Sequence, residues 1–219
     1  MNLPNALTAT RIVVTPLIAL LPFANSWPLR FTAFWLFLAA AITDYVDGML
    51  ARSRKQETDL GKLLDPLADK LLLLGTFVPM YLLAPTFPFV TPLGSFGLPW
   101  WIVAIVLGRE AFMTIFRQIA ARRGVVIAAI GPAKWKTAFQ LIWQGSAYFW
   151  FFAATLAAVR GWSGAPWRGF ALFNGLVGTI MMIAAVVLTI YTLVLYMRMF
   201  GGVFAGASNR EAARRHRTP

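Results

Sequence analysis

Four aspartates with helical spacing are the first residues in this chain whose types and positions could do chemistry. Asp44 and Asp47 lie three residues apart, and Asp65 and Asp69 lie four residues apart. Each pair therefore occupies one face of a helix, and a short polar turn brings the two faces together in antiparallel helices. Four gathered carboxylates repel one another, and hard divalent cations with oxygen ligands offset that charge. The pattern predicts a site for two Mg²⁺ ions, with Mn²⁺ as the alternative, able to clamp a phosphoryl displacement.

Small residues lie on the same two helix faces as the aspartates. Gly48, Ala51 and Gly61 leave room for a ligand to approach the backbone. Arg52 and Lys70 are nearby cations that could pair with part of the negative charge. Room beside a metal site and a cation next to it both suit a phosphate-bearing substrate.

Two interpretations without catalysis compete with a metal site. The four carboxylates could be separately solvated at a membrane surface, as Glu57 and Asp59 are interpreted. Alternatively, intramembrane acids could carry protons or cations in a transporter. A transporter does not explain why the four aspartates gather at one end of their helices.

A polar face also opens the chain. Asn5, Thr8 and Arg11 recur every three residues at the start of an apolar segment. They are either an ordinary capped helix start at a membrane surface or contacts to a nucleotide or its phosphates.

A second charged cluster lies farther along the chain. Arg109 and Glu110 sit about ten residues inside an apolar segment, where a charge is a functional candidate by default. Arg117, two turns later, shares a face with Arg109, and Lys134 and Lys136 open the next segment. A basic pocket of this kind suits an acceptor that carries a phosphate, with Glu110 pairing with a neighbouring cation. The alternative is that Arg117, Lys134 and Lys136 are anchors at a membrane surface.

Composition indicates the elements that must position these residues. Of 219 residues 59% are hydrophobic and 13% charged, cysteine is absent, and the formal net charge is +12. Soluble domains have roughly 25% charged residues, so a soluble enzyme, a disordered protein and a disulfide-stapled domain are excluded. Six apolar segments are long enough to span a bilayer, and they predict an all-α integral membrane protein, a bundle of six transmembrane helices. These segments are residues 8–24, 30–52, 61–84, 99–122, 134–158 and 170–198.

Loop charges predict the orientation of the bundle. Three loops (24–30, 84–99 and 158–170) hold only Arg30, Arg160 and Arg168, and most other cations lie on the opposite side. By the positive-inside rule both termini are cytoplasmic. The loop over 85–99 is rich in proline and is expected to be irregular. A cleaved signal peptide at the first segment is disfavoured, because its cleavage site is poor and five further segments follow.

The predicted domain is residues 1–200, followed by a basic, disordered cytoplasmic tail over 201–219. The excess positive charge is assigned to anionic lipid and substrate phosphates, and nucleic acid is not an expected partner.

The acidic stretch resembles the signature of the CDP-alcohol phosphotransferase family, Asp-x2-Asp-Gly-x2-Ala-Arg-x8-Gly-x3-Asp-x3-Asp. All eight fixed positions are present: Asp44, Asp47, Gly48, Ala51, Arg52, Gly61, Asp65 and Asp69. The resemblance implies that a hydroxyl displaces CMP from a CDP-linked lipid alcohol, with two divalent ions held by the four aspartates and Asp69 as general base. It also implies contacts from Arg52 to the diphosphate and from Gly48 and Ala51 to the cytidine. The opening Asn5, Thr8 and Arg11 run is similar to that family's opening as well.

The second cluster resembles the phosphatidylglycerophosphate synthase branch of that family. The residues that carry this likeness are Gly108, Arg109, Glu110, Arg117, Lys134, Lys136, Thr137 and Gln140, with a departure at Ala133, where the branch often has glycine. The likeness implies CDP-diacylglycerol as donor, glycerol 3-phosphate as acceptor, a homodimer, and a bacterial inner-membrane enzyme whose active site faces the cytoplasm. Inositol phosphate, inositol, serine and phosphatidylglycerol are the alternative acceptors.

Overall fold

The computed structural model describes residues 3–54, 59–128 and 130–201; for residues 3–4, 45–54, 59–63 and 65 it describes the backbone alone. The basic tail predicted over 201–219 lies outside the described residues from 202 onward.

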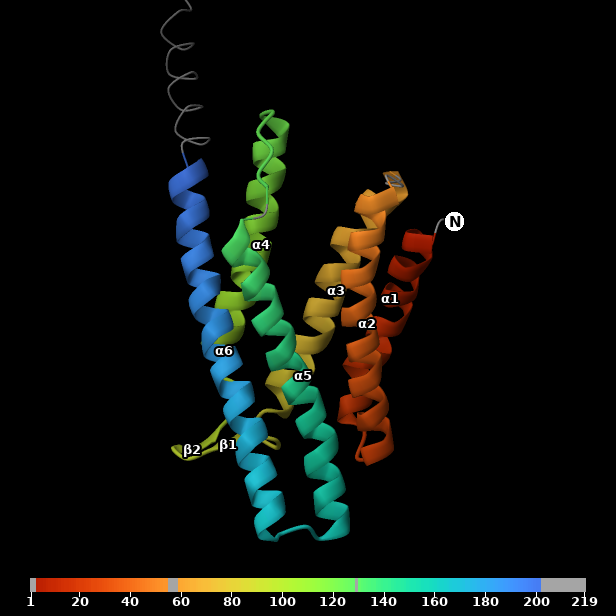
Figure 1. The fold of residues 1–219 in the computed structure, drawn as a ribbon, viewed down its shortest axis with the longest axis vertical. Coiled ribbons are helices and arrows are strands. Elements are labelled where there is room, and N and C mark those ends of the chain that lie inside the picture. The colour runs from red at the N-terminus through yellow and green to blue at the C-terminus, as the bar shows by residue number, and fades with distance from the viewer. Residues whose placement is uncertain (1–2, 55–58, 129, 202–219) are drawn as a thin grey trace, which may run out of the picture. The chain divides into compact units, whose positions relative to one another are not determined.

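Six long helices dominate the described residues (Figure 1). They are α1 (Leu3–Leu20), α2 (Trp27–Arg54), α3 (Asp59–Leu83), α4 (Trp100–Arg122), α5 (Gly131–Arg160) and α6 (Ala165–Phe200), with a 3₁₀ turn, η1 (Leu21–Phe23), after α1. Each coincides with one predicted segment to within a few residues, which confirms the helical class. Within the described ranges, three stretches are long and apolar enough to cross a membrane: Asn5–Phe23, Pro66–Leu83 and Ala165–Phe200. The count of six spans and the cytoplasmic location of the termini stay predictions.

The connection over 85–99 was predicted to be irregular, and this prediction was wrong for residues 89–96. Strands β1 (Phe89–Thr91) and β2 (Gly94–Phe96) pair there as an antiparallel hairpin. The Thr91 hydroxyl closes the turn, since it donates to the carbonyl of Gly94 at 2.8 Å and accepts from the Leu93 amide at 3.3 Å. Gly94 has a φ of 118°, which favours glycine. Of the prolines that suggested an irregular loop, Pro92 lies within the hairpin turn, and Pro85, Pro88 and Pro99 lie outside the two strands.

The chain forms two compact units. The first comprises residues 1–100 and 140–182, and the second comprises residues 101–139 and 183–219. Helices α5 and α6 each contribute to both units.

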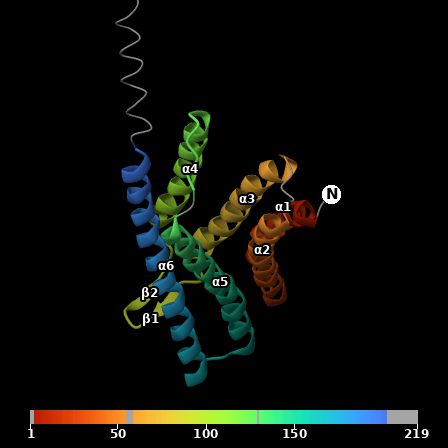
Figure 2. The ribbon, with the colours of Figure 1, turned by 45° about the horizontal axis from the view of Figure 1, so that its top comes forward.

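In the first unit, α1 lies beside α2 and α3 in both views (Figures 1 and 2). Gly75 of α3 faces Thr15 of α1 so closely that a Cβ at position 75 would lie 2.8 Å from the Thr15 methyl group. The hydroxyl of Tyr148 on α5 bonds to the carbonyls of Ile18 and Gly75, at 3.2 and 3.1 Å. Close approach at a small residue and hydrogen bonds between helices are the contacts that hold helices together in lipid.

The hairpin and α6 meet at two further glycines of the first unit. A Cβ at Gly178 would lie 2.6 Å from the Phe89 ring, and one at Gly175 would overlap the carbonyl of Val90. Strand β1 can therefore approach α6 only because these positions lack side chains.

In the second unit, α4, the connection that leads into α5 and the second half of α6 surround a small core. Met113, Phe116 and Tyr196 are its buried residues. Partly buried side chains pack against them, namely Ile127, Ile130, Leu193, Met197 and Phe200.

Replacement of Gly75 tests the close approach of α1 and α3. Because the Thr15 hydroxyl donates to the Arg11 carbonyl at 2.7 Å, the Thr15 side chain is not free to rotate away. We expect Gly75→Ala to lower the thermal-denaturation midpoint in detergent, corresponding to about 1–3 kcal/mol of overpacking. The matched control is Gly169→Ala, where an added Cβ meets no atom within 4 Å and the helix gains propensity. Equal midpoints for the two variants would contradict the close packing.

Candidate active site

The polar face of α1 points into the protein. Asn5, Thr8 and Arg11 are 7%, 1% and 3% exposed, respectively. Polar side chains are buried in this way only when they find partners, because an unsatisfied polar group in an apolar interior costs several kcal/mol. The three-residue repeat recognised in the sequence is therefore an interior face, which makes a simple helix start at a membrane surface the weaker interpretation.

Arg11 brings two of the predicted metal ligands together. Its Nη1 lies 2.5 Å from Asp44 Oδ1 and 3.2 Å from Asp69 Oδ1. These residues come from α1, α2 and α3, so one guanidinium group joins three helices. The Arg11 side chain is 1% exposed, whereas the side chains of Asp44 and Asp69 are 46% and 59% exposed. The two carboxylates thus keep an open side toward a ligand.

The other residues of the acidic signature are placed by their backbone alone. Asp47, Gly48, Ala51 and Arg52 lie on the last part of α2, and Gly61 and Asp65 lie on the first part of α3. Their side chains lie outside the described part of the chain. The sequence interpretation of these six residues stays a prediction.

The described residues fit a hard cation at this site, although no group of three metal-ligating side chains occurs among them. Asp44 and Asp69 come from different helices and both direct a carboxylate oxygen to a single positive group, the guanidinium of Arg11. Their negative charge therefore converges at the Arg11 guanidinium. Carboxylate oxygens are the donors that Mg²⁺ and Mn²⁺ prefer.

A second site, in the other unit, is organised by Glu110. Arg109 on α4 donates from Nη1 to Glu110 Oε1 at 2.8 Å. Lys136 on α5 donates from Nζ to the same oxygen. Arg109 and Lys136 are 7% and 4% exposed. The prediction that Glu110 pairs with a neighbouring cation is confirmed, and it pairs with two.

Residues of α6 that the sequence analysis missed complete this cluster. Thr192 accepts from Arg109 Nη2 at 3.2 Å. One turn later, the Tyr196 hydroxyl accepts from Arg117 Nη2 at 3.4 Å and from the Ile130 amide at 3.1 Å. Both side chains are fully buried. The available signal was a pair of hydroxyl groups four residues apart, which places them on one face of α6.

The four cations predicted to bind an acceptor phosphate therefore fall into two classes. Arg109 and Lys136 are buried and paired, whereas Arg117 and Lys134 are exposed. Arg117 is nevertheless held by the Tyr196 ring, 5.7 Å from its centroid.

Comparison with known proteins identifies the family. A sequence model described as CDP-alcohol phosphatidyltransferase matches residues 1–191. The chain belongs to this family. The matched region contains the whole acidic signature and most of the basic cluster, and it ends just before Thr192. The resemblance seen in the sequence is therefore confirmed at the level of the family.

The relatives of this chain differ in the reaction that their names describe. A probable phosphatidylglycerophosphate synthase of Mycobacterium tuberculosis is 35% identical over 144 residues, covering 64% of this chain and 63% of the relative. A CDP-diacylglycerol–glycerol-3-phosphate 3-phosphatidyltransferase of Cereibacter sphaeroides is 36% identical, covering 64% of this chain and 60% of the relative. A CMP-forming cardiolipin synthase of Streptomyces coelicolor is 32% identical, covering 76% of this chain and 75% of the relative. The chain thus spans less than two thirds of the first two relatives.

Removal of the Glu110 charge tests the organisation of the basic cluster. We expect Glu110→Gln to lower the free energy of unfolding by about 3–5 kcal/mol, because two buried cations lose their shared carboxylate. The measurement is the thermal-denaturation midpoint in detergent.

The control for this variant removes one of the two cations as well. Glu110→Gln combined with Lys136→Met should recover part of the loss, since fewer unpaired charges stay buried. A double variant no more stable than Glu110→Gln would contradict the charge pairing.

Proposed function

We propose that this protein transfers the phosphatidyl group of CDP-diacylglycerol to sn-glycerol 3-phosphate, yielding phosphatidylglycerophosphate and CMP. The observation that carries the proposal is the convergence of Asp44 and Asp69 on one cation within the signature of the family. The names of the mycobacterial and Cereibacter relatives support the choice of substrates.

Asp44, Asp47, Asp65 and Asp69 would hold two Mg²⁺ or Mn²⁺ ions. When bound, these ions supply charge neutralisation to a diphosphate and to the oxygens of an in-line displacement. Asp44 and Asp69 contribute oxygens from two helices whose separation is set by Arg11. Asp47 and Asp65 are assigned to the same ions because they occupy the other two aspartate positions of the signature.

Other residues of the first unit would bind the CDP-lipid. Asn5, Thr8 and Arg11 present a buried polar face beside Asp44, and Gly48, Ala51, Arg52 and Gly61 belong to the same helices. A guanidinium between carboxylates can also rotate toward a phosphate oxygen, because arginine offers five donors in a planar fork. Arg11 therefore serves both the carboxylates and the diphosphate.

Asp69 would act as general base on the acceptor. It takes the proton of the glycerol 1-hydroxyl, and the hydroxyl oxygen forms a bond to the β-phosphorus of CDP-diacylglycerol. The bond from that phosphorus to the bridging oxygen breaks, and CMP leaves with the bridging oxygen. The exposed fraction of the Asp69 side chain, 59%, leaves it accessible to an incoming hydroxyl.

Arg109, Arg117, Lys134 and Lys136 would bind the acceptor's phosphate. Arginine forks and ammonium groups both form charge-assisted hydrogen bonds to phosphate oxygens. The protein would act in a bacterial inner membrane as a multi-pass homodimer, as the family resemblance implies. Its site would face the cytoplasm, since the predicted loop charges favour that orientation.

A second acceptor is favoured by one observation. The Streptomyces relative is named a CMP-forming cardiolipin synthase, so relatives of similar identity differ in their named product. Phosphatidylglycerol is therefore the main alternative acceptor, ahead of inositol phosphate, inositol and serine.

An acceptor panel tests the function directly. Protein purified in detergent is incubated with CDP-diacylglycerol, Mg²⁺ and one labelled acceptor at a time, and CMP release is measured. We expect release with glycerol 3-phosphate, its loss on chelation by EDTA, and recovery when Mg²⁺ is restored. CMP with phosphatidylglycerol alone would assign the cardiolipin reaction instead. If no acceptor gave CMP release while the protein stayed folded, the assignment as a transferase would be overturned.

The acidic signature is tested by neutral substitutions. Asp44→Asn and Asp65→Asn should each lower kcat by at least about 100-fold, because a neutral amide is a poor ligand for a hard cation. The control is Asp59→Asn, outside the signature, which should retain full activity. Asp44→Asn with normal kcat and an unchanged elution volume in gel filtration would refute the metal-binding assignment.

A further inference from the structure

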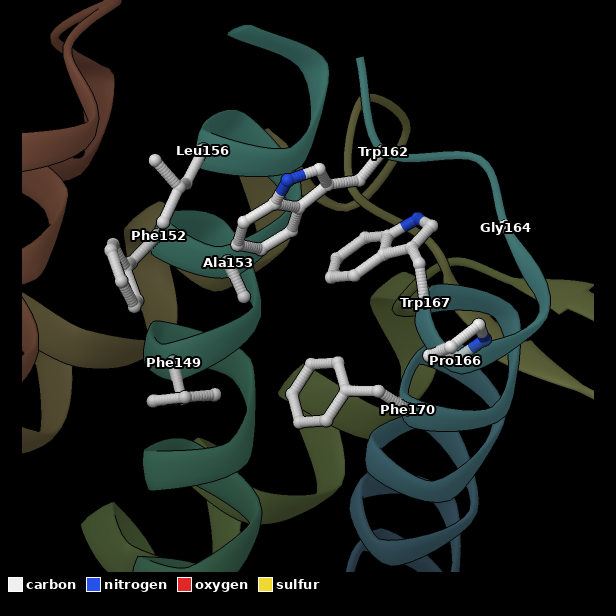
Figure 3. Close-up of a pocket in the computed structure, with 9 residues that line it drawn as sticks. All are labelled: Phe149, Phe152, Ala153, Leu156, Trp162, Gly164, Pro166, Trp167 and Phe170. Atoms are coloured by element: carbon white, nitrogen blue, oxygen red, sulfur yellow. The ribbon is translucent and has the colours of Figure 1, made fainter. Parts of the chain in front are cut away.

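An apolar pocket lies where α5 and α6 are joined, within the first unit. It has a volume of about 610 Å³, within the size range of ligand pockets. Figure 3 shows aromatic side chains of both helices and of the connecting turn directed toward it. Its lining is Phe149, Phe152, Ala153, Leu156, Trp162, Gly164, Pro166, Trp167 and Phe170.

Contacts between rings fix the walls of this pocket. Trp167 stacks on Trp150 with centroids 5.6 Å apart and planes 6° apart, and it contacts Phe170 at 5.6 Å. Phe170 in turn meets Phe149 at 5.9 Å. The indole of Trp150 donates to the Pro88 carbonyl at 3.1 Å, which anchors the stack. These contacts hold the aromatic walls of the pocket in place.

Two arginines lie close to the pocket along the chain. Arg160 ends α5 and Arg168 lies next to Trp167, and both are exposed. Arg160 follows Phe149, Ala153 and Leu156 at helical spacing, so it continues the face of α5 that lines the pocket. No aspartate or glutamate occurs in the sequence between Glu110 and Glu211. The two arginines therefore have no carboxylate nearby in the chain.

We propose that this pocket binds one acyl chain of an anionic phospholipid, whose headgroup phosphate is held by Arg160 and Arg168. The hydrocarbon of a bilayer is as apolar as the pocket, so transfer from water does not drive binding. An acyl chain binds because an unfilled pocket forfeits dispersion contacts along its aromatic walls. The choice among lipids comes from the arginines, which favour an anionic headgroup over a zwitterionic one.

A second copy of the chain is a poorer occupant. A twofold-symmetric contact through this face would bring the arginines of one copy toward the same arginines of the other. That repulsion is absent when the occupant supplies a phosphate.

The lipid site is distinct from the candidate active site. Phe152 of the pocket contacts Phe31 of α2, with centroids 4.8 Å apart. Asp44 lies farther along the same helix, and a rise of 1.5 Å per residue separates the two positions by roughly 20 Å. Lipid bound here does not occupy the carboxylate site.

Photo-crosslinking tests the proposal locally. The full chain is reconstituted into phosphatidylcholine bilayers containing a small fraction of photoreactive phosphatidylglycerol or of photoreactive phosphatidylcholine with the same acyl chain. Crosslinked peptides are then mapped by mass spectrometry. We expect several-fold more labelling of residues 149–170 by phosphatidylglycerol than by phosphatidylcholine.

Charge variants test whether the preference for the anionic lipid depends on the two arginines. Arg160→Gln with Arg168→Gln should reduce phosphatidylglycerol labelling to the phosphatidylcholine level, and either single variant should reduce it in part. The matched control Arg198→Gln removes an exposed arginine from the far end of α6 and should leave labelling unchanged. Equal labelling by the two lipids, or a preference that survives both substitutions, would overturn the proposal. So would a chain that elutes as a dimer and shows no labelling of this segment.

Discussion

The first unit depends on one buried cation between two carboxylates. Asp44 and Asp69 approach each other in a chain dominated by apolar residues, and Arg11 makes that approach possible. Because these residues belong to α2, α3 and α1, the same ion pairs that offset the charge also fix how the three helices meet. The close contact at Gly75 and the two hydrogen bonds of Tyr148 then hold α1 and α3 farther along their lengths.

Much of this architecture could be predicted because apolar length is a strong signal. The six apolar segments correspond to α1–α6 within a few residues, as in chains whose helices must satisfy their own backbone groups. The acidic signature identified the family through its eight fixed positions. Its spacing within each helix also predicted that each pair of aspartates shares a face. The spacing of Asn5, Thr8 and Arg11 likewise predicted a common face.

Other parts could not be predicted, because they depend on contacts between distant residues. Sequence reasoning offered Arg52 and Lys70 as counter-charges for the aspartates, and the described pairs are made by Arg11, far away in the chain. Thr192 and Tyr196 lie more than 70 residues from the arginines that they contact. The β1–β2 hairpin was hidden by prolines, and its position depends on Gly175 and Gly178 of α6.

The hydrogen bonds of Glu110 have a consequence for acceptor choice. One carboxylate neutralises half of the charge of Arg109 and Lys136, so the three side chains together keep a single positive charge. That charge balances a phosphodiester, which is a monoanion. A phosphate monoester carries close to two negative charges and requires one more cation in the same unit. Arg117, exposed and held at Tyr196, is placed to supply it. In the proposed function, the arginine held at Tyr196 would therefore distinguish a soluble phosphate monoester from a lipid phosphodiester as the acceptor.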